Sequence, residues 1–438
     1  MKRWLLVMVL LLGPLLTLPS TIALAGNVDT YGIGAKAIAL GGAFTAYADD
    51  PFAAYYNPAG LTQIKSPMIS MGAEILDPTL KLPNYSAKDY NGNKVQPYDT
   101  ELSDTSSDLV APHFGFAIPT PGFNRLVFGF AVYSPYGLHI KWDNNPAVNP
   151  GAYNSFESYY IRVVANPTIA YKINDKLSVG FGVAIGRSYS GSQRRLYAPS
   201  MPNLNNRVIK GSFTDDTNYS FNFGIMYRPI KQLVLGAAYR SRTHTNFKGT
   251  VELVGVQKVD ADTSIDHPDQ VQVGVRYMPS DKVSVEADVV WTHWSVVDKY
   301  TIHFHQPFMG KTKETFPRSW KNTKRVRFGV EWKATKLLTL RAGYYYDPTP
   351  IPDDTFDLLW PDGDKKTYSL GAGLNFTKHL SLDIALQYTI SEYTREIGGE
   401  SSNLNSSYSN PVTGAPGSVS TKAKGHLWGY ALTVNYKF

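Results

Sequence analysis

The amino-acid sequence predicts an all-β protein, a transmembrane antiparallel β-barrel of 14 strands with an N-terminal hatch (plug) segment containing short helices. Three observations predict it: a two-residue alternation of apolar and polar side chains, a regular sorting of short and long connections, and an N-terminal export signal. Successive side chains of a strand point to opposite faces, so a closed sheet of this pattern places lipid outside and a lumen inside. The sequence therefore predicts a protein of the bacterial outer membrane.

The alternation is clearest at the end of the chain, where large apolar residues from Trp428 to Phe438 alternate with small or polar ones. Residues 283–291 and 380–388 follow the same pattern. A transmembrane strand needs only about 9–11 residues, half of them apolar, which accounts for the negative mean hydropathy. The predicted strands begin near Ile64, Asp108, Arg125, Tyr159, Leu177, Thr217, Gln232, Asp269, Lys282, Lys321, Leu337, Thr367, Leu380 and Lys424.

The connections between these strands are alternately short and long. Turns of a few residues, such as 174–176, 279–281 and 377–379, follow the even-numbered strands. Short periplasmic turns and long extracellular loops are typical of outer-membrane barrels, and an even strand count leaves both barrel ends in the periplasm. Long polar connections follow the odd-numbered strands, at roughly 82–107, 142–158, 192–216, 255–268, 305–320, 348–366 and 394–423.

Residues 1–25 have the features of a signal peptide. Lys2 and Arg3 precede an apolar stretch over 4–18, and Ala23-Leu24-Ala25 is a small-residue cleavage site. The apolar stretch is short for a membrane anchor. We therefore expect export and removal of this segment.

Residues 26–63 form the predicted hatch, ahead of a barrel over 64–438. The segment lacks strand alternation and is rich in Gly and Ala. Asp49-Asp50-Pro51 is a plausible helix start, with an Asp cap before Pro, and the run 57–60 would end that helix. A disordered tail is the alternative, but the segment is too apolar for a free chain, and a wide barrel needs its lumen filled.

Composition excludes several classes of function. The chain has no Cys, so disulfides and thiolate metal sites are ruled out. The formal charge of +7 is mild, and no nucleic-acid-binding motif accompanies it. Aromatic residues make up 13% of the chain, which suits interfacial girdles but would also suit a sugar-binding β protein.

Several stretches together are similar to the FadL/TodX family of outer-membrane transporters for long-chain fatty acids and other hydrophobic molecules. The stretches that carry the resemblance are 41–51 and 55–61 with its Asn-Pro-Ala core, Ser134-Pro135-Tyr136-Gly137, Thr292-His293-Trp294-Ser295, and 346–352. The terminal Phe438 fits the assembly signal of outer-membrane barrels. The resemblance covers essentially the whole mature chain.

The resemblance implies a mechanism as well as a fold. The extracellular loops would capture a hydrophobic ligand, and a tight site would lie between hatch and barrel. Release would then go sideways, through a gap where the third strand is kinked. We expect long-chain fatty acids as substrate, with aromatic or alkane hydrocarbons as the alternative.

The resemblance indicates candidate residues for each step of this mechanism. The hatch and kink groups also have a purely structural explanation. Hatch and gating candidates are Asp49, Asp50, Asn57, Pro58, Ala59 and Gly60, which turn and cap chemistry alone could also explain. Candidates for the kink and lateral exit are Ser134, Pro135, Tyr136 and Gly137, where the strand could instead simply end. Ligand-binding candidates are Phe52, Tyr55, Tyr56, Arg162, Arg327, Arg341, Phe356, Leu359 and Trp360.

Two of these groups have a specific alternative. The apolar loop residues, which also include Phe308, Met309, Phe316 and Leu358, could pack loop on loop rather than meet a ligand. The inward Arg residues share the lumen with Glu286, Asp288, Glu331 and Asp383, so they could form a structural charge network.

No catalytic site, metal site or cofactor is expected. His303 and His305 share one strand face, but no third metal ligand is suggested. A general porin, a lipid-modifying enzyme and an adhesin or phage receptor remain as rival functions. The expected partners are the outer-membrane bilayer, a hydrophobic small molecule and the barrel-assembly machinery at Phe438, with the barrel itself a monomer.

Overall fold

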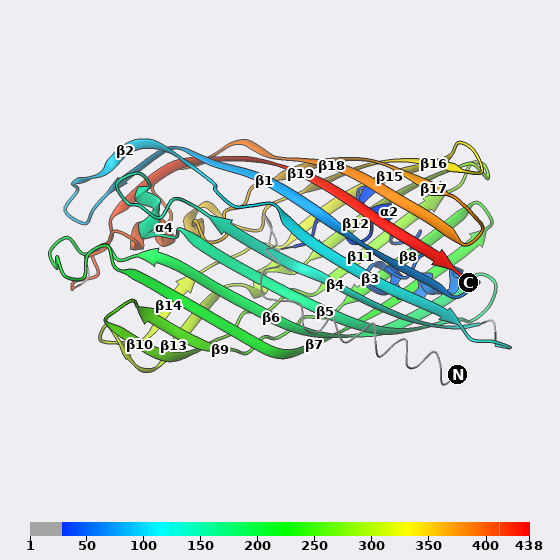
Figure 1. Cartoon of the computed structure of the whole chain (residues 1–438), viewed down its shortest axis with the longest axis horizontal. Helices are drawn as coiled ribbons and strands as arrows, with labels where there is room; N and C mark the ends of the chain where they lie inside the picture. Colours follow the sequence, from blue (N-terminus) through cyan, green and yellow to red (C-terminus); the bar gives the residue numbers. More distant parts are fainter. Residues whose placement is uncertain (1–28, 124, 411) are drawn as a thin grey trace.

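The protein is a closed antiparallel β-barrel with short helices inside it (Figure 1). The computed structural model describes residues 29–123, 125–410 and 412–438. The predicted signal peptide lies outside the described residues. Within them, β1 pairs with β19 from Met68↔Lys437 onward, which closes the sheet on itself. The predicted fold class, with 14 barrel strands, is confirmed.

The barrel strands lie next to one another in chain order, and each pairs antiparallel with the next. They are β1 (Met68–Lys88), β3 (Leu109–Pro119), β4 (Leu126–Lys141), β5 (Glu157–Lys172), β6 (Leu177–Arg195), β7 (Val208–Ile230), β8 (Leu233–Arg240), β11 (Gln270–Tyr277), β12 (Val283–Thr292), β15 (Thr323–Lys333), β16 (Leu338–Asp347), β17 (Lys365–Asn375), β18 (Leu380–Ile397) and β19 (Ser418–Lys437).

The long connections differ from the prediction, because much of their length is sheet rather than polar loop. Strands β1, β6, β7, β18 and β19 continue well past the predicted ends. Most of these extensions bury hydrophobic side chains in the core above the barrel, which favours continued backbone pairing there. Five further strands lie in the connections: β2 (Lys94–Ser103), β9 (Phe247–Leu253), β10 (Gln257–Thr263), β13 (Lys299–Phe308) and β14 (Lys311–Pro317).

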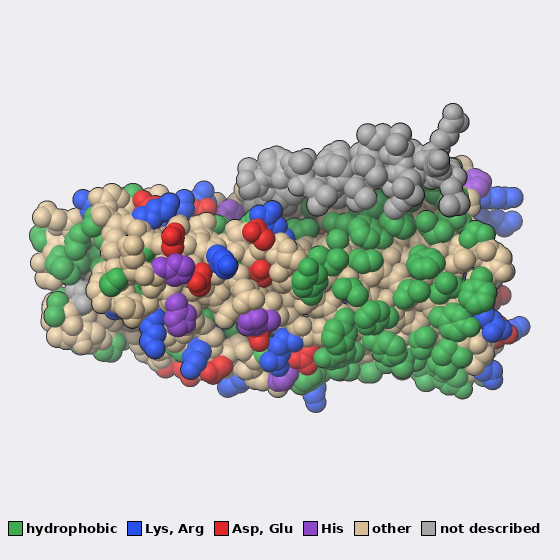
Figure 2. Space-filling model, turned by 90° about the horizontal axis from the view of Figure 1, so that it is seen from below, with side chains coloured by type: hydrophobic (Ala, Val, Ile, Leu, Met, Phe, Trp, Pro, Cys, Tyr) green, Lys and Arg blue, Asp and Glu red, His purple; other side chains and the backbone are tan. Residues whose placement is uncertain are grey.

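An apolar belt surrounds the half of the barrel that ends in the short turns (Figure 2). Outward side chains there are exposed although they are large and hydrophobic, for example Leu370 at 62%, Trp332 at 49% and Phe328 at 48%. Their inward neighbours on the same strands are small or polar, as the alternation requires. Such a belt is the lipid-facing surface of a transmembrane barrel. The part of the chain that the structure describes contains no helix long and apolar enough to cross a membrane.

The described part of the hatch fills the lumen within this half. It contains α2 (Ala35–Ala39), α3 (Ala53–Tyr56) and the 3-10 helix η1 (Pro58–Gln63). Nearly all of its residues are buried, and most of its apolar side chains form a core with inward residues of β1 and of β3 to β8, whereas part of α2 packs on β18 and β19. The physical reason is the predicted one: small residues let the backbone lie close to the wall, and a few aromatic rings fill the remaining space.

The predicted hatch helix is placed slightly wrongly. It begins at Ala53 rather than directly at Pro51, and no side chain caps it at Phe52. The Asp50 carboxylate instead accepts a hydrogen bond from the Phe52 amide at 2.8 Å, within a turn that leads into α3. Asn57 does end α3, and its side chain then caps η1 by accepting from the Ala59 amide at 3.1 Å.

The other half of the molecule is a roof, formed by the long connections and the strand ends that carry them. Its core is a second, larger hydrophobic cluster that includes Trp142, Phe247, Phe304, Trp320 and Tyr408. Short helical turns complete it: η2 (Pro150–Tyr153), η3 (Trp294–Val296), η4 (Asp353–Thr355) and α4 (Ser402–Ser406). The roof therefore covers the mouth of the barrel opposite the short turns (Figure 1).

Candidate functional site: hatch, strand β4 and roof

The hatch is anchored by two carboxylates of β12. Asp288 Oδ2 accepts hydrogen bonds from the Phe44 amide at 3.0 Å, the Thr45 amide at 3.0 Å and the Thr45 hydroxyl at 2.7 Å. Glu286 Oε1 accepts from the Ala46 amide at 2.7 Å. Both side chains lie two residues apart on the inward face of β12, so one strand satisfies consecutive donors of the hatch turn.

Further polar contacts, made by side chains of both the hatch and the wall, hold the rest of the hatch. Asn57 donates to the backbone oxygens of Thr45 at 2.7 Å and of Ile225 in β7 at 3.1 Å. Arg240 of β8 donates to the Tyr55 oxygen at 2.8 Å, with its guanidinium 3.9 Å from the Tyr55 ring centre. Contacts of this kind fix the backbone itself, because they satisfy amides and carbonyls that no helix or strand pairs.

The remaining hatch candidates have clear structural roles. Asp49 forms an ion pair with Lys36 at 2.6 Å. Pro58 and Ala59 lie directly against Gly180 of β6, where any side chain would collide with them, and Gly60 has no room for a Cβ beside Ala48. The gating role of this group stays a prediction, and the contacts explain why these residue types are needed for packing.

Strand β4 has an irregularity at the predicted kink. Its register against β5 shifts between Tyr133 and Tyr136, and the buried positions change from odd to even numbers there, so that Pro135 and Tyr136 are both buried. This is the pattern of a β-bulge, which re-aims the side chains that follow it. Pro contributes by lacking a ladder donor.

Beside the bulge, the pairing of β4 with β3 is incomplete. The β3–β4 ladder runs from Pro119↔Val127 to Phe114↔Val132, and in the described residues it goes no further. The segment that precedes β3 contacts the far end of β4, where the Lys141 backbone oxygen accepts from the Thr105 amide at 2.7 Å and the Ser106 hydroxyl donates to the His139 oxygen at 3.4 Å. The edge of β4 over 133–140 is thus free of ladder bonds to its neighbour, and we call this stretch the β4 window.

On its lumenal side, the β4 window is met by the start of the hatch. The Thr30 amide donates to the Pro135 oxygen at 3.1 Å. Tyr136 stacks on His267 with ring centres 4.2 Å apart, and the His267 ring is hydrogen-bonded to the Tyr160 hydroxyl at 3.0 Å. The window is therefore closed from within mostly by aromatic contacts.

The three candidate Arg residues differ in their partners. Arg341 lies between Glu331 at 2.8 Å and Asp383 at 2.6 Å, so its charge is neutralised. Arg327 donates to the Gly42 oxygen at 3.2 Å and supports the hatch. Arg162 is 1% exposed, and the partners identified within the described residues are neutral: Asn218 at 2.8 Å and Ser220 at 3.4 Å.

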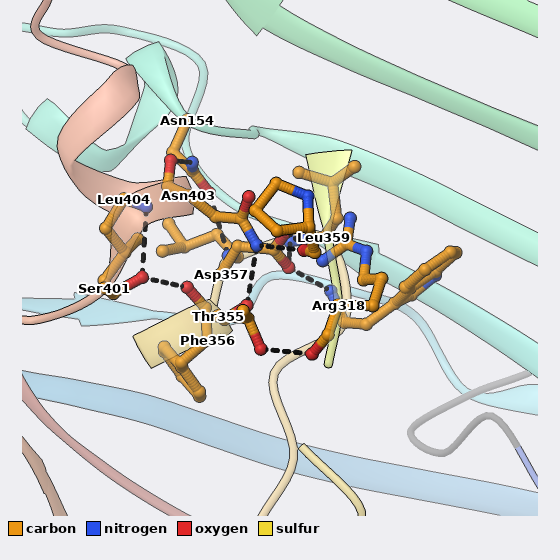
Figure 3. Close-up of polar contacts among 12 residues, drawn as sticks. Asn154, Arg318, Thr355, Phe356, Asp357, Leu359, Ser401, Asn403 and Leu404 are labelled. Atoms are coloured by element: carbon orange, nitrogen blue, oxygen red, sulfur yellow. Dashed lines mark hydrogen bonds and ion pairs between the residues drawn. The ribbon is translucent and has the colours of Figure 1, made fainter. Parts of the chain in front are cut away.

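The apolar loop candidates lie inside the roof, in line with the alternative that loops pack on loops. Phe356 is fully buried, Trp360 is buried and Leu359 is half-buried, and of the wider group only Met309 is exposed, at 38%. A network of polar contacts holds their segment (Figure 3). In it, Arg318 pairs with Asp357 at 2.6 Å, and the side-chain amide of Asn403 donates to the backbone oxygen of Thr355 at 2.7 Å.

A small chamber of about 50 Å³, partly open to solvent, lies between the roof and the hatch. Tyr31 of the hatch, Leu427 of β19 and the β4 residues His139 and Ile140 are among its lining residues. The chamber therefore reaches the inner face of the strand that carries the β4 window. Two of its cations, Lys365 and Arg395, are already paired, with Asp362 at 2.5 Å and Asp353 at 2.6 Å.

Sequence reasoning missed several residues that shape this region. Thr30, His267 and the Arg318–Asp357 pair all act through contacts with distant segments, and no local pattern marks them. For Glu286 and Asp288 the strand period did predict that they face inward. It did not predict that hatch amides would be their partners.

Comparison with known proteins agrees with this architecture. Residues 16–438 match the protein family described as "Outer membrane protein transport protein (OMPP1/FadL/TodX)". The long-chain fatty acid transport protein of Escherichia coli O6:H1 is 22% identical over 90% of each chain. The structure of a Pseudomonas aeruginosa FadL homologue has a TM-score of 0.79 at 23% identity, covering 95% of this chain and 99% of that one. The structure of the Ralstonia pickettii toluene transporter has a TM-score of 0.65 at 17% identity, covering 93% of this chain and 99% of that one.

The match to the family spans nearly the whole chain, whereas the two solved structures show the shared fold. The matched family is one of outer-membrane transport proteins, and the barrel, the lipid-facing belt and the lumenal hatch agree with that description. The chain therefore belongs to the OMPP1/FadL/TodX family, and it is an outer-membrane transporter of hydrophobic compounds.

Proposed function

We propose that this protein takes up long-chain fatty acids by roof capture, a hatch-gated lumenal site and lateral release through the β4 window. The observation that carries the proposal is the window itself. An apolar solute crosses a water-filled pore poorly, and a gap in the wall would offer it a sideways exit instead. The relative named for long-chain fatty acid transport supports the choice of substrate.

Arg162 is the residue proposed to meet the ligand carboxylate. It is buried, it lies on β5 opposite Tyr136 of the window, and its identified partners are neutral. A buried cation of this kind can gain a charge-assisted hydrogen bond from an anionic ligand without breaking an existing ion pair. Arg327 and Arg341 would act indirectly, by holding the hatch and the wall.

Entry would begin in the roof. Phe356, Leu359 and Trp360 would contact a ligand once the roof loosens, since they are largely buried in its closed form. Phe52, Tyr55 and Tyr56 of the hatch would form the apolar floor of the path. Asp49, Asp50 and the run 57–60 would hold the hatch turns that must adjust as the ligand passes.

Uptake by cells that lack their own long-chain fatty-acid transporter tests the proposal. Radiolabelled oleate and toluene are supplied to cells carrying the wild type, Pro135→Ala, Asn57→Ala or Arg162→Met. We expect Arg162→Met to lower oleate uptake about tenfold or more, because a charge-assisted hydrogen bond is worth about 1.5–3 kcal/mol, and to spare toluene uptake. Pro135→Ala should lower the uptake of both solutes.

The exposed barrel residue Arg187 provides the matched control, as Arg187→Met, with the amount of folded protein in the outer membrane measured for every variant. Toluene uptake without oleate uptake would move the substrate to hydrocarbons, the second candidate, which the likeness to a toluene transporter favours. Uptake of neither solute by folded wild type would refute the proposal. We also propose that the barrel is a monomer and that Phe438 engages the assembly machinery.

A further inference from the structure

Every short turn of the barrel, or the strand end beside it, carries a basic residue. The turns after β5, β7, β11, β15 and β17 contain Lys176, Lys231, Lys282, Lys336 and Lys378, and all five side chains are exposed. The turn after β3 is followed by the exposed Arg125. Turn geometry does not require Lys, since Asn, Asp, Gly, Pro and Ser are the residues that turns favour.

We call the basic residues at this end of the barrel the basic collar. Eleven side chains form it: Lys65, Arg125, Lys172, Lys176, Arg228, Lys231, Lys282, Lys333, Lys336, Lys378 and Lys437. The same segments contain two acidic side chains, Asp175 and Asp281, so eleven minus two gives the collar a charge of +9. The whole chain has a formal charge of only +7. The excess positive charge of the protein is therefore concentrated at one end.

Within the described residues, this charge is hardly compensated. Of the eleven cations, Lys172 alone forms an ion pair, with Asp175 at 2.8 Å. Around Lys65 the cations are close enough to affect one another, because burial, then Lys172 and Arg228, lower the pKa of Lys65. The roof differs, because its surface charges include ion pairs such as Lys81–Glu101 at 2.8 Å. A ring of cations with few acidic neighbours attracts anions.

The collar directly adjoins the lipid-facing belt (Figure 2). Trp332 in the belt precedes Lys333, and exposed Tyr227 and Tyr277 lie at the same level on β7 and β11. Aromatic rings at the edge of a belt mark the boundary between hydrocarbon and headgroups. Lys and Arg just beyond such rings have stems long enough to place their charge among the headgroups.

We propose that the basic collar binds the phosphate groups of anionic phospholipids in the leaflet around the short-turn end of the barrel. The cations occur at all six turns and at the C-terminal end of β19, so they surround the barrel. A soluble partner docking on one side would reach a few of them, whereas a lipid annulus reaches all. The proposal rests on the membrane location and not on the identity of the transported solute.

Competition between two phospholipids tests this proposal. The full-length folded barrel in detergent is mixed with equal amounts of phosphatidylglycerol and phosphatidylcholine, and the lipids retained are counted by native mass spectrometry. We expect about fivefold or greater enrichment of phosphatidylglycerol. Each basic residue near an anionic membrane surface contributes about 1 kcal/mol of attraction, which corresponds to about a fivefold preference. Raising NaCl from about 0.05 M to about 0.5 M should reduce the enrichment by screening.

Variants test whether the basic collar is the source of the phosphatidylglycerol enrichment. Lys176→Gln, Lys231→Gln, Lys282→Gln, Lys336→Gln and Lys378→Gln are combined, one from each turn. The matched control removes five exposed roof lysines: Lys210→Gln, Lys248→Gln, Lys258→Gln, Lys311→Gln and Lys313→Gln. The collar variant should lose the enrichment and the control should keep it. Equal retention of the two lipids by wild type, enrichment insensitive to salt, or equal loss in both variants would each overturn the proposal.

Discussion

The hatch meets two sides of the barrel in different ways. On the side from β5 to β15, wall side chains bind it through a series of hydrogen bonds, among them those of Asp288, Glu286 and Arg240. On the side of β1, β3 and β4, the contacts identified within the described residues are the hydrogen bond from the Thr30 amide to the Pro135 oxygen and aromatic contacts such as Tyr55–Tyr133 and Phe52–His113.

The difference indicates which side can move. Hydrogen bonds to buried backbone groups are directional, and leaving one unmade costs about 1–3 kcal/mol. Aromatic contacts add only about 0.5–1.5 kcal/mol beyond area burial, and they tolerate sliding. We therefore expect rearrangement on the β4 side while the β12 side stays in place, and the following predictions test this expectation.

The largest effect is expected at the fixed side. Asp288→Ala leaves three buried donors of the hatch turn without their acceptor, at a cost of about 3 kcal/mol or more. The hatch should loosen, and conductance in planar bilayers should rise from nearly closed to steady open channels. Asp216→Ala, at a carboxylate 79% exposed, is the control. Unchanged conductance in Asp288→Ala would show that β12 does not hold the hatch.

A smaller effect is expected for Asn57→Ala. The change removes the cap of η1 and two hydrogen bonds that join separate segments. We expect the hatch to lose about 2 kcal/mol of stability, from the typical costs of removing a helix cap and a hydrogen bond. Amide hydrogen exchange in 44–63 should accelerate, while exchange in the barrel strands stays the same. The exposed Asn91→Ala is the comparison. Equal exchange in both variants would argue against Asn57 as a structural link.

On the β4 side we expect a change in function with little loss of stability. Tyr133→Leu removes the edge-on contact with Tyr55, whose ring centres are 5.1 Å apart, and one hydrogen bond from Asn166. The expected loss is about 1–2 kcal/mol, and thermal unfolding should change little. Solute uptake should nevertheless change severalfold. An unfolding shift as large as that of Asp288→Ala would remove the contrast between the two sides.

The smallest effect is a pH dependence at the roof side of the window. Burial and, after it, the nearby Arg162 hold the pKa of His267 well below its usual 6.5. Below about pH 6.5 the folded state therefore binds fewer protons than the unfolded state. The contribution of neutral His267 to the free energy of unfolding is complete above about pH 6.5 and decreases as the pH falls below it. Melting temperatures at pH 7.5 and pH 5 should differ less in His267→Phe than in wild type. The exposed His244→Phe should keep the wild-type difference.

The barrel could be predicted from the sequence because its signals are local. A strand alternates with a period of two whatever it pairs with, so positions such as Arg341 and Asp383 were correctly predicted to face inward. The short turns were identified because their signals, like those of the strands, are local. The roof strands were missed because their polar outer faces resemble loops, and only pairing with distant segments makes them sheet.

The candidate site was predicted unevenly. The run Asn57-Pro58-Ala59-Gly60 is rich in turn-forming residues, so the end of the helix was predicted there, whereas the cap that Asn57 provides to η1 was not. A kink near Pro135 was predicted, because Pro cannot donate to a ladder, and the register of β4 does shift between Tyr133 and Tyr136. The free ladder edge beside it depends on where β3 ends its pairing, which is a property of two strands and not of one.

By itself, the sequence determined the number of barrel strands, the face that each presents to lipid, the small-residue hatch and the ring of lysines at the turns. The tertiary structure alone decided which inward charges are paired, which wall groups hold the hatch and where the wall is left open. The physical reason is register. Strand stagger brings Arg341 to Glu331 and Asp383 but leaves Arg162 beside Asn218 and Ser220, and no local pattern records that stagger.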